Sequence, residues 1–195
     1  MASGRDVPQA KTNLEIKARC RDLAAARAAA TRLATRYLGV DAQTDTYFVT
    51  RAGRLKLRRS SVSGGQLIPY LRPDRPGPKR ADYQVIPVPD AAHLERTLAT
   101  ILGVHRVVRK RREIFLVDNV RIHLDEVEGL GCFLELEAVY DGSESAEAEQ
   151  HAVVARLMRE LGVAEDDLVA TSYEGLLDPA RAGSARAPDP AAPIS

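Results

Sequence analysis

Residues 121–137 read RIHLDEVEGLGCFLELE, and the fold that we expect for the chain follows from the pattern of these residues. Side chains alternate between the two faces of an extended strand, so Asp125 lies on one face of the first arm. After a turn over the glycines in 129–131, the alternation resumes and puts Glu135 and Glu137 on one face of the second arm. A hairpin of this kind sets the three carboxylates on the same side of a sheet. Their repulsion must be offset by a cation, either a divalent metal or a cluster of Lys and Arg.

The composition predicts one domain that binds neither nucleic acid nor membrane. The 195 residues are enough for one domain with a substantial core. The formal net charge is only +1, so any strong electrostatic field must be local. Aromatic residues, which nucleic-acid grooves use for stacking, make up 5% of the chain and include no Trp. No hydrophobic leader and no run of about 18 apolar residues occurs, so we expect a soluble, cytoplasmic protein.

Periodicity and turn residues divide the chain into about eight strands and three helices. We expect a flexible N-terminus at 1–11, one domain at 12–177 and a disordered tail at 178–195. Hairpins or peripheral helices join the strands, so antiparallel pairing is expected throughout. The expected strands are 13–20, 43–50, 54–60, 66–72, 83–88, 104–118 and the two arms of 121–137, the expected helices are 21–39, 90–103 and 145–161, and a loop is expected at 73–82.

Charged side chains follow the polar face of five of these strands. A closed antiparallel barrel with these faces turned inward encloses a tunnel lined by both signs of charge. The alternative is a sandwich whose charged faces meet water, and the alternation alone leaves both architectures open. Bases and acids fall on different strands, which favours a substrate with several phosphates, because Lys and Arg bind phosphate oxygens and carboxylates hold a divalent metal. The bases are Lys56, Arg58, Arg72, Lys79, Arg80, Lys110 and Arg112, and the acids are Asp125, Glu126, Glu135 and Glu137.

Six motifs, in order along the chain, together resemble the CYTH superfamily. They are Glu15-Ile-Lys17, GRLKLR at 53–58, YLR at 70–72, the VxKxR pattern at 108–112, the hairpin at 121–137 and SYEGLL at 172–177. These triphosphate tunnel metalloenzymes include class IV adenylyl cyclases and thiamine triphosphatases, and the motifs are most similar to the bacterial cyclase-like branch. The resemblance implies an α+β fold, a closed eight-stranded antiparallel β-barrel with peripheral helices. It also implies a polyphosphate or nucleotide substrate, Mg²⁺ or Mn²⁺ as cofactor, and a homodimer.

The resemblance assigns roles by motif position. Glu15, Lys17 and Asp125 would be catalytic. The family's first strand usually reads Glu-x-Glu-x-Lys, and here its first acid is replaced by Asn13. An amide oxygen can coordinate a metal but brings no charge, so affinity for a second metal ion should fall. The implied metal ligands are Glu15, Asp125, Glu135 and Glu137, and the implied phosphate-binding residues are Lys17, Lys56, Arg58, Arg72, Lys79, Lys110 and Arg112.

Three functions remain open from the sequence. The favoured one is cyclisation of ATP to cyclic AMP and pyrophosphate. The second is a triphosphatase that hydrolyses tripolyphosphate, a nucleoside triphosphate or thiamine triphosphate. The third, motivated by Asn13, is a binding protein or an enzyme recruited to another diphosphate-bearing metabolite. His123 is expected to be a hydrogen-bonded wall residue, and Tyr173 either closes one tunnel mouth or simply packs.

Overall fold

The computed structural model of the chain describes residues 11–71 and 77–178. The expected N-terminal segment at 1–11 and the expected tail at 178–195 lie almost wholly outside the described residues, and Arg72 lies outside them too. The described strands are β1 (Lys11–Arg19), β2 (Arg36–Phe48), β3 (Arg54–Ser60), β4 (Gly64–Leu71), β5 (Lys79–Tyr83), β6 (Ile86–Val88), β7 (Val104–Val117), β8 (Val120–Val127) and β9 (Gly131–Tyr140), and the α-helices are α1 (Leu23–Leu33), α2 (Ala91–Leu102), α3 (Glu144–Glu160) and α4 (Tyr173–Leu176).

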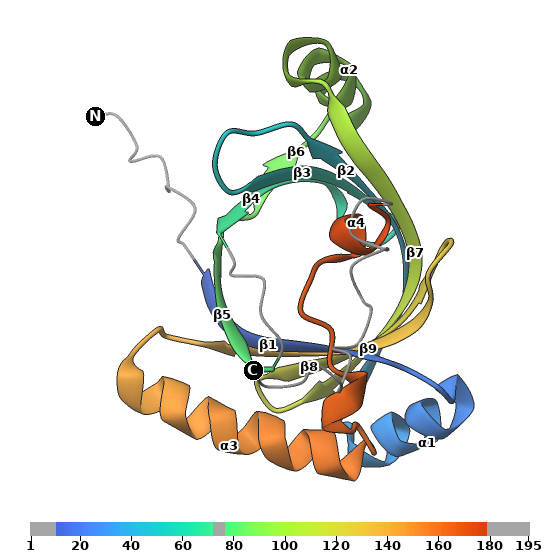
Figure 1. Ribbon diagram of the computed structural model, residues 1–195, viewed down its shortest axis with the longest axis vertical. Coiled ribbons are helices and arrows are strands. Elements are labelled where there is room, and N and C mark those ends of the chain that lie inside the picture. Colours follow the sequence, from blue (N-terminus) through green and yellow to red (C-terminus); the bar gives the residue numbers. More distant parts are fainter. Residues whose placement is uncertain (1–10, 72–76, 179–195) are drawn as a thin grey trace, which may run out of the picture.

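The strands form one antiparallel sheet that closes on itself (Figure 1). Its order is β3-β2-β7-β8-β9-β1-β5-β4-β6, and an additional pairing between β3 and β4 closes the ring. Eight strands therefore make the barrel, and β6 extends it by pairing with β4 alone. The predicted closed eight-stranded antiparallel barrel with peripheral helices is confirmed, and the sandwich alternative is excluded.

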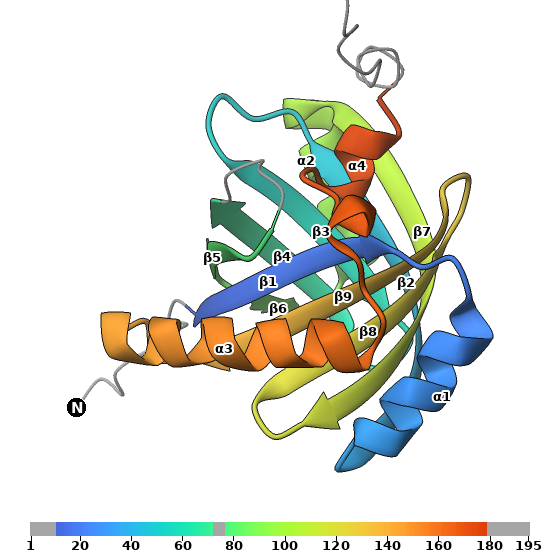
Figure 2. The ribbon, with the colours of Figure 1, turned by 60° about the horizontal axis from the view of Figure 1, so that its bottom comes forward.

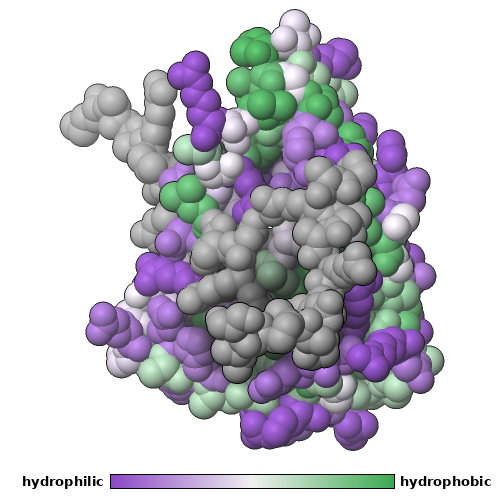
Figure 3. All heavy atoms as spheres, viewed as in Figure 1, coloured by the Kyte–Doolittle hydropathy of each residue, from purple (hydrophilic) through white to green (hydrophobic). Residues whose placement is uncertain are grey.

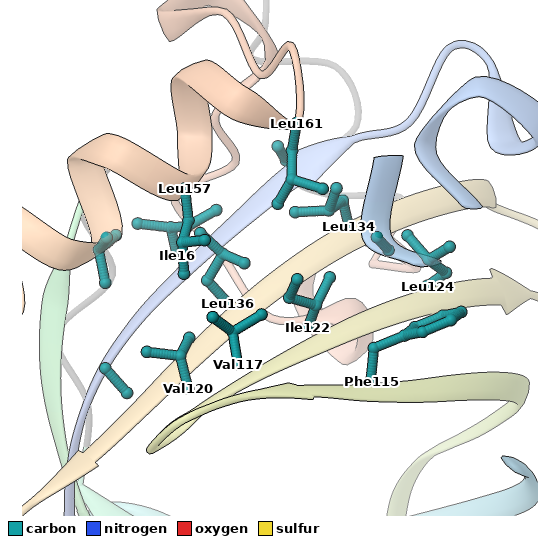
Figure 4. Close-up of a cluster of buried hydrophobic side chains, with 14 of the residues drawn as sticks. Ile16, Phe115, Val117, Val120, Ile122, Leu124, Leu134, Leu136, Leu157 and Leu161 are labelled. Atoms are coloured by element: carbon teal, nitrogen blue, oxygen red, sulfur yellow. The ribbon is translucent and has the colours of Figure 1, made fainter. Parts of the chain in front are cut away.

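The main hydrophobic core lies outside the barrel, between its wall and two helices. Helices α1 and α3 cover the outer surface of β1, β8 and β9 (Figure 2). Leu157 of α3 packs onto Ile16, Ile122 and Leu136 of these strands, and all four side chains are buried (Figure 4). Each such side chain contributes about 1.5–3 kcal/mol when it leaves water. Because the apolar residues of these strands face the helices, the alternating charged residues must face the barrel interior.

Helix α1 ends earlier than the sequence predicted. The expected helix at 21–39 begins correctly, with Asp22 accepting the cap hydrogen bond from the backbone N–H of Ala25, but it stops at Leu33. The following segment belongs to β2, which pairs with β7 from Arg36 onward. Gly39, expected as a helix stop, instead lies at a register shift in this strand with φ +97°. Pairing with a long, distant strand thus overrides the local helical pattern of the alanine-rich segment.

The loop expected at 73–82 is also partly a strand. Lys79–Tyr83 forms β5, which pairs with β1 over five residues and completes the barrel wall. The strand expected at 83–88 is reduced to the three residues of β6. Local Pro and Gly signals could not reveal β5, because its partner strand lies more than 60 residues earlier in the chain.

Helices α2 and α3 form close to where they were expected. Asp90 and Ser143 accept the N-terminal cap hydrogen bonds, and Gly103, with φ +77°, ends α2. None of the helices in the described ranges is long and apolar enough to cross a membrane. Figure 3 shows hydrophobic side chains gathered at the α2 end of the molecule, where Val49 and Ile101 are exposed.

The chain after α3 returns across one end of the barrel and closes it. Val169 donates its backbone N–H to the carbonyl of Lys17 at 2.8 Å, which fixes this segment to β1. Helix α4 then lies over one opening of the ring of strands (Figures 1 and 2). Tyr173 of α4 packs against Tyr47 and Phe133 in a second, smaller hydrophobic cluster. The barrel interior is thus closed by side chains at the α4 end.

Candidate active site

A cavity of about 400 Å³ occupies the barrel interior, within the size range of small-molecule sites. All eight barrel strands and α4 contribute to its lining. Eight residues that the sequence assigned to metal or substrate line it: Glu15, Lys17, Lys56, Arg58, Lys110, Arg112, Glu135 and Glu137.

Strand register explains why these side chains meet. On β1 and β9, Glu15 lies directly opposite Glu137, and Lys17 lies opposite Glu135. On β8 and β9, His123 lies opposite Glu135. Directly opposed residues share a face of the sheet, so the charged face of the predicted hairpin and that of the first strand converge inside the barrel.

Glu135 is bound by two cations and lies beside His123, and the three groups come from three strands. It accepts hydrogen bonds from Lys17 Nζ and Arg112 Nη2, and His123 Nδ1 lies 3.7 Å from its Oε2. Burial alone would raise the pKa of Glu135, but the charges of Lys17 and Arg112 hold that pKa well below its usual range. Burial lowers the pKa of His123, with Arg112 acting in the same direction. The centre of the site is therefore an ionised carboxylate between two cations, beside a neutral imidazole.

Asp125 lies behind Arg112 and is not part of the cavity lining. It is fully buried, accepts a hydrogen bond from Arg112 Nε at 2.6 Å, and accepts one from Tyr173 Oη at 2.8 Å. The sequence assigned Asp125 to metal and catalysis. In the structure it is the counter-charge that orients the guanidinium of Arg112, and its metal and catalytic roles stay predictions.

Glu137 receives hydrogen bonds from three different side chains. Asn13 Nδ2 donates to its Oε1 at 2.7 Å, Tyr83 Oη donates to the same oxygen at 3.2 Å, and Arg121 Nη1 donates to Oε2 at 3.2 Å. The other end of the Asn13 amide, Oδ1, is buried and has no hydrogen-bond partner. Sequence reasoning missed the roles of Tyr83 and Arg121. Arg121 could have been found from the sequence, because it lies on the same strand face as Asp125. Tyr83 could not, because its position depends on β5, which the sequence did not reveal.

Three cations on the opposite wall share one buried carboxylate, Asp45 of β2. Arg58 donates to it through Nε at 2.7 Å and Nη2 at 2.8 Å, Lys56 Nζ donates at 3.1 Å, and Lys110 Nζ lies 3.7 Å away. Burial and the charge of the nearby Arg58 lower the pKa of Lys56 to about 8. Burial and the charge of Arg112 lower the pKa of Lys110 to about 7. Sequence reasoning missed Asp45, although it shares a strand face with Tyr47, which lines the cavity.

Two predicted phosphate-binding bases lie elsewhere. Lys79 is fully buried outside the cavity lining, and its Nζ donates to the carbonyls of Ala170 at 2.8 Å and Val169 at 3.4 Å. Its described contacts thus fix the segment that leads into α4. Arg80 lies on the outer face of β5, pairs with Asp82 at 3.2 Å and does not line the cavity.

Tyr173 both packs and closes the α4 end of the cavity. Its ring lies 5.0 Å from that of Phe133, centroid to centroid, in an edge-to-face arrangement. Lys17 Nζ lies 3.4 Å from the centroid of the Tyr173 ring, which adds a cation–π contact to the ion pair with Glu135. Tyr173 therefore positions two charged residues of the site, Lys17 directly and Arg112 through Asp125.

The acids of the cavity fit a divalent metal whose ligands come partly from the protein and partly from a bound substrate. Within residues 11–71 and 77–178, no three Asp, Glu, His or Cys side chains lie close enough to hold a metal alone. Mg²⁺ in nucleotide sites is usually bound by one or two carboxylates together with water and phosphate oxygens. Glu15 and Glu137, opposed on β1 and β9, supply two such carboxylates, and the unpartnered Oδ1 of Asn13 is a further oxygen beside them.

Comparison with known proteins agrees with this geometry. The family model described as CYTH domain matches residues 11–173. The candidate adenylate cyclase MJ0240 of Methanocaldococcus jannaschii is 33% identical over 67 residues, which cover 34% of this chain and only 37% of that protein.

Solved structures show the same fold at low sequence identity. A candidate adenylate cyclase from Vibrio parahaemolyticus superposes with a TM-score of 0.68 at 23% identity, over 87% of this chain and 99% of that one. The adenylyl cyclase-like protein HpAC1 from Hippeastrum, described as having a dominant triphosphatase activity, gives a TM-score of 0.55 at 15% identity, over 85% and 94%.

Proposed function

The chain belongs to the CYTH domain family, and we propose that it is a metal-dependent enzyme that acts on a triphosphate bound in the barrel cavity. One observation carries this proposal. The cavity has a wall of cations, Lys56, Arg58 and Lys110, that faces carboxylates on β1 and β9, and it is closed at the α4 end. A polyphosphate with bound metal carries both signs of charge and complements both walls.

Each wall has its own part in the mechanism. The cationic wall binds phosphate oxygens and neutralises the negative charge that develops on the departing phosphate. Glu15 and Glu137 would hold Mg²⁺ or Mn²⁺, which when bound polarises a phosphoryl oxygen. Lys17, fixed by Glu135 and the ring of Tyr173, places an ammonium group next to the same phosphates. These charges act in an interior from which water is largely excluded, where they stabilise a transition state more strongly than they would in water.

The favoured reaction is cyclisation of ATP. The ribose 3′-hydroxyl attacks the α-phosphorus, and its proton passes to solvent. The bond from the α-phosphorus to the oxygen that bridges it to the β-phosphorus breaks, and pyrophosphate leaves. The names of the Methanocaldococcus and Vibrio relatives support this version. In the alternative, water attacks the terminal phosphorus, the bond from that phosphorus to its bridging oxygen breaks, and orthophosphate and the shortened phosphate chain leave. The activity named for the Hippeastrum protein supports this version.

A third candidate is a protein for another diphosphate-bearing metabolite, with catalysis of triphosphate turnover weakened. The bond from Asn13 to Glu137 favours it, because a neutral amide stands where the family usually has an acid.

Product analysis distinguishes these candidates. The purified protein is incubated with ATP, tripolyphosphate or thiamine triphosphate and with Mg²⁺ or Mn²⁺, and products are identified by ³¹P NMR. Cyclic AMP with pyrophosphate supports the cyclase, and orthophosphate supports the hydrolase. Absence of turnover with every triphosphate overturns both enzyme functions.

Two variants on one hairpin supply the matched control. Glu135→Gln should lower turnover by about 100-fold or more, because it removes the carboxylate that orients Lys17 and Arg112. Glu126→Gln removes an exposed acid on the outer face, paired with Arg111, and should leave turnover unchanged. Equal activity of both variants would remove Glu135 from the mechanism.

A further inference from the structure

Asp45 lies behind the cationic wall rather than on it. The side chain is 1% exposed, and it does not line the cavity, whereas Lys56, Arg58 and Lys110 do. Asp45 receives both forks of the Arg58 guanidinium, at 2.7 and 2.8 Å, and the Lys56 ammonium at 3.1 Å. A substrate in the cavity would therefore meet the cations and not their counter-charge.

Asp45 is the carboxylate on which this group of cations depends. Three positive charges and one negative charge leave the group at +2. Two other acids act on Lys110 through their charge, Asp125 and Glu135, and both are bound to Arg112 or Lys17. Without Asp45, three buried cations would repel one another with no anion between them, at a cost that rises steeply in a low-dielectric interior.

We propose that Asp45 is a positioning residue that holds Lys56, Arg58 and Lys110 in place and charged, and so sets the affinity of the cavity for the polyphosphate part of its substrate. This inference rests on the proposed function. Asp45 itself makes no contact with substrate and acts only through its three partners.

The two lysines make this role measurable. Lys110 and Lys56 have pKa values of about 7 and about 8, so their charge is already close to being lost at neutral pH. An opposite charge within about 4–6 Å typically supports the charged form by 1–3 pKa units. The groups that face Lys110 are Asp45, Arg58, Arg112, Asp125, Glu135 and Tyr173, and those that face Lys56 are Asp45, Arg58, Arg112, Tyr47 and Tyr70.

Loss of the Asp45 charge should therefore weaken affinity more at the alkaline end of the pH range than at the acidic end. At pH 8, Asp45→Asn should bind tripolyphosphate at least about tenfold more weakly than the wild type, because the lysines are neutral before the ligand arrives. At pH 5.5, this difference should narrow or reverse, because the lysines of the variant regain charge as the pH falls and an anion behind them is gone. A purely structural defect would weaken binding by the same factor at both pH values.

The experiment is isothermal titration of the full chain with tripolyphosphate from pH 5.5 to 8.5, without metal. The ratio of variant to wild-type affinity cancels the titration of the ligand itself. The matched control is Glu113→Gln, which removes another buried carboxylate, bound to Arg27 and Arg111 on the outer face of β7. The ratio of its affinity to that of the wild type should stay constant with pH. Asp45→Glu keeps the charge and should restore the wild-type profile.

The outcomes separate this inference from the proposed function. If wild-type protein does not bind tripolyphosphate at any pH, either without metal or with Mg²⁺ added, the proposed function fails. If the wild type binds and Asp45→Asn has the same affinity ratio at pH 5.5 and pH 8, the role of Asp45 is overturned.

If Asp45→Asn does not fold, Lys110→Met and Asp45→Asn/Lys110→Met are compared, since the net charge of the group in the double variant equals that of the wild type. At pH 8 the double variant should still bind tripolyphosphate more weakly than Lys110→Met, because Lys56 has lost the support of the Asp45 charge. Equal affinities of the two variants would overturn the positioning role of Asp45.

Discussion

Asn13 of β1 donates a hydrogen bond of 2.7 Å from Nδ2 to Oε1 of Glu137 on β9. Asn13 is the position where the first strand departs from the usual Glu-x-Glu-x-Lys pattern. Its partner, Glu137, is the last acid of the hairpin at 121–137. Burial would raise the pKa of Glu137, but His123, Arg121 and the Asn13 amide together lower it. Asn13 thus stabilises the ionised form of Glu137 without a metal, which an acid at this position could not do.

The first prediction concerns Asn13→Glu. In the absence of divalent metal, this variant should be destabilised by about 1–3 kcal/mol, because it replaces a donor to Glu137 with a like charge. Mg²⁺ should then raise its melting temperature more than that of the wild type, since a third carboxylate strengthens metal binding. Thermal unfolding with EDTA and with Mg²⁺ measures both effects. Asn13→Gln is the neutral control, and identical Mg²⁺ shifts in all three proteins would show that Asn13 does not limit metal affinity.

The second prediction compares two arginines on β7. Arg112 is buried between Asp125 and Glu135, whereas Arg109 is 60% exposed and pairs with Glu128 at 3.8 Å. Arg112→Met should cost about 3–5 kcal/mol of unfolding free energy, because it leaves two buried carboxylates without their cation. Arg109→Met should cost less than about 1 kcal/mol. Urea unfolding measures both, and similar losses would mean that the buried pairs are no stronger than the surface pair.

The fold could be predicted largely from alternation. The strands expected at 54–60 and 104–118 agree closely with β3 and β7, because bases alternate with leucines in the first and Val, Ile and Phe are enriched in the second. The end of α1 and the existence of β5 could not be predicted, because both are decided by pairing with strands far away in the chain. Local patterns report the face that a residue occupies, and they do not report which distant strand it will meet.

The sequence could predict which side chains of the site face inward and what charge they carry. It could not predict which of them reach the cavity surface and which lie behind others. Alternation correctly placed Asp125 on the inward face with Glu135, yet only the closed barrel shows that Asp125 lies behind Arg112. Lys79 likewise points inward, and its Nζ meets backbone carbonyls because the chain after α3 returns to that end of the barrel. Asp45 was missed because its partners lie on β3 and β7, and nothing in segment 43–50 alone distinguishes it from a solvated acid.

The third prediction is a pH dependence of stability. Lys110 has a pKa of about 7 in the folded protein and near 10.5 when unfolded, so between these values the unfolded chain binds more protons. Stability from this residue therefore rises with pH above 7, by at most about 1.4 kcal/mol per pH unit. Relative to Lys110→Met, ligand-free wild-type protein should gain stability from pH 7 to 9 in urea unfolding. Lys56→Met is the control, since its difference from the wild type should begin to change near pH 8, and parallel curves for all three proteins would contradict the depressed lysine pKa values.

The last prediction tests the closure of the barrel by α4. Tyr173→Phe keeps the ring under Lys17 but removes the hydroxyl that donates to Asp125 at 2.8 Å. Asp125 is fully buried, so the missing donor should cost about 1–3 kcal/mol of unfolding free energy. Tyr140→Phe, which removes a 2.8 Å bond to the half-exposed Glu147, is the matched control and should cost less than about 1 kcal/mol. If Arg112 is oriented through Asp125, Tyr173→Phe should also weaken tripolyphosphate binding in a titration, while Tyr140→Phe should not. Unchanged stability and affinity in Tyr173→Phe would mean that Arg112 alone holds Asp125, and that α4 contributes packing without positioning the site.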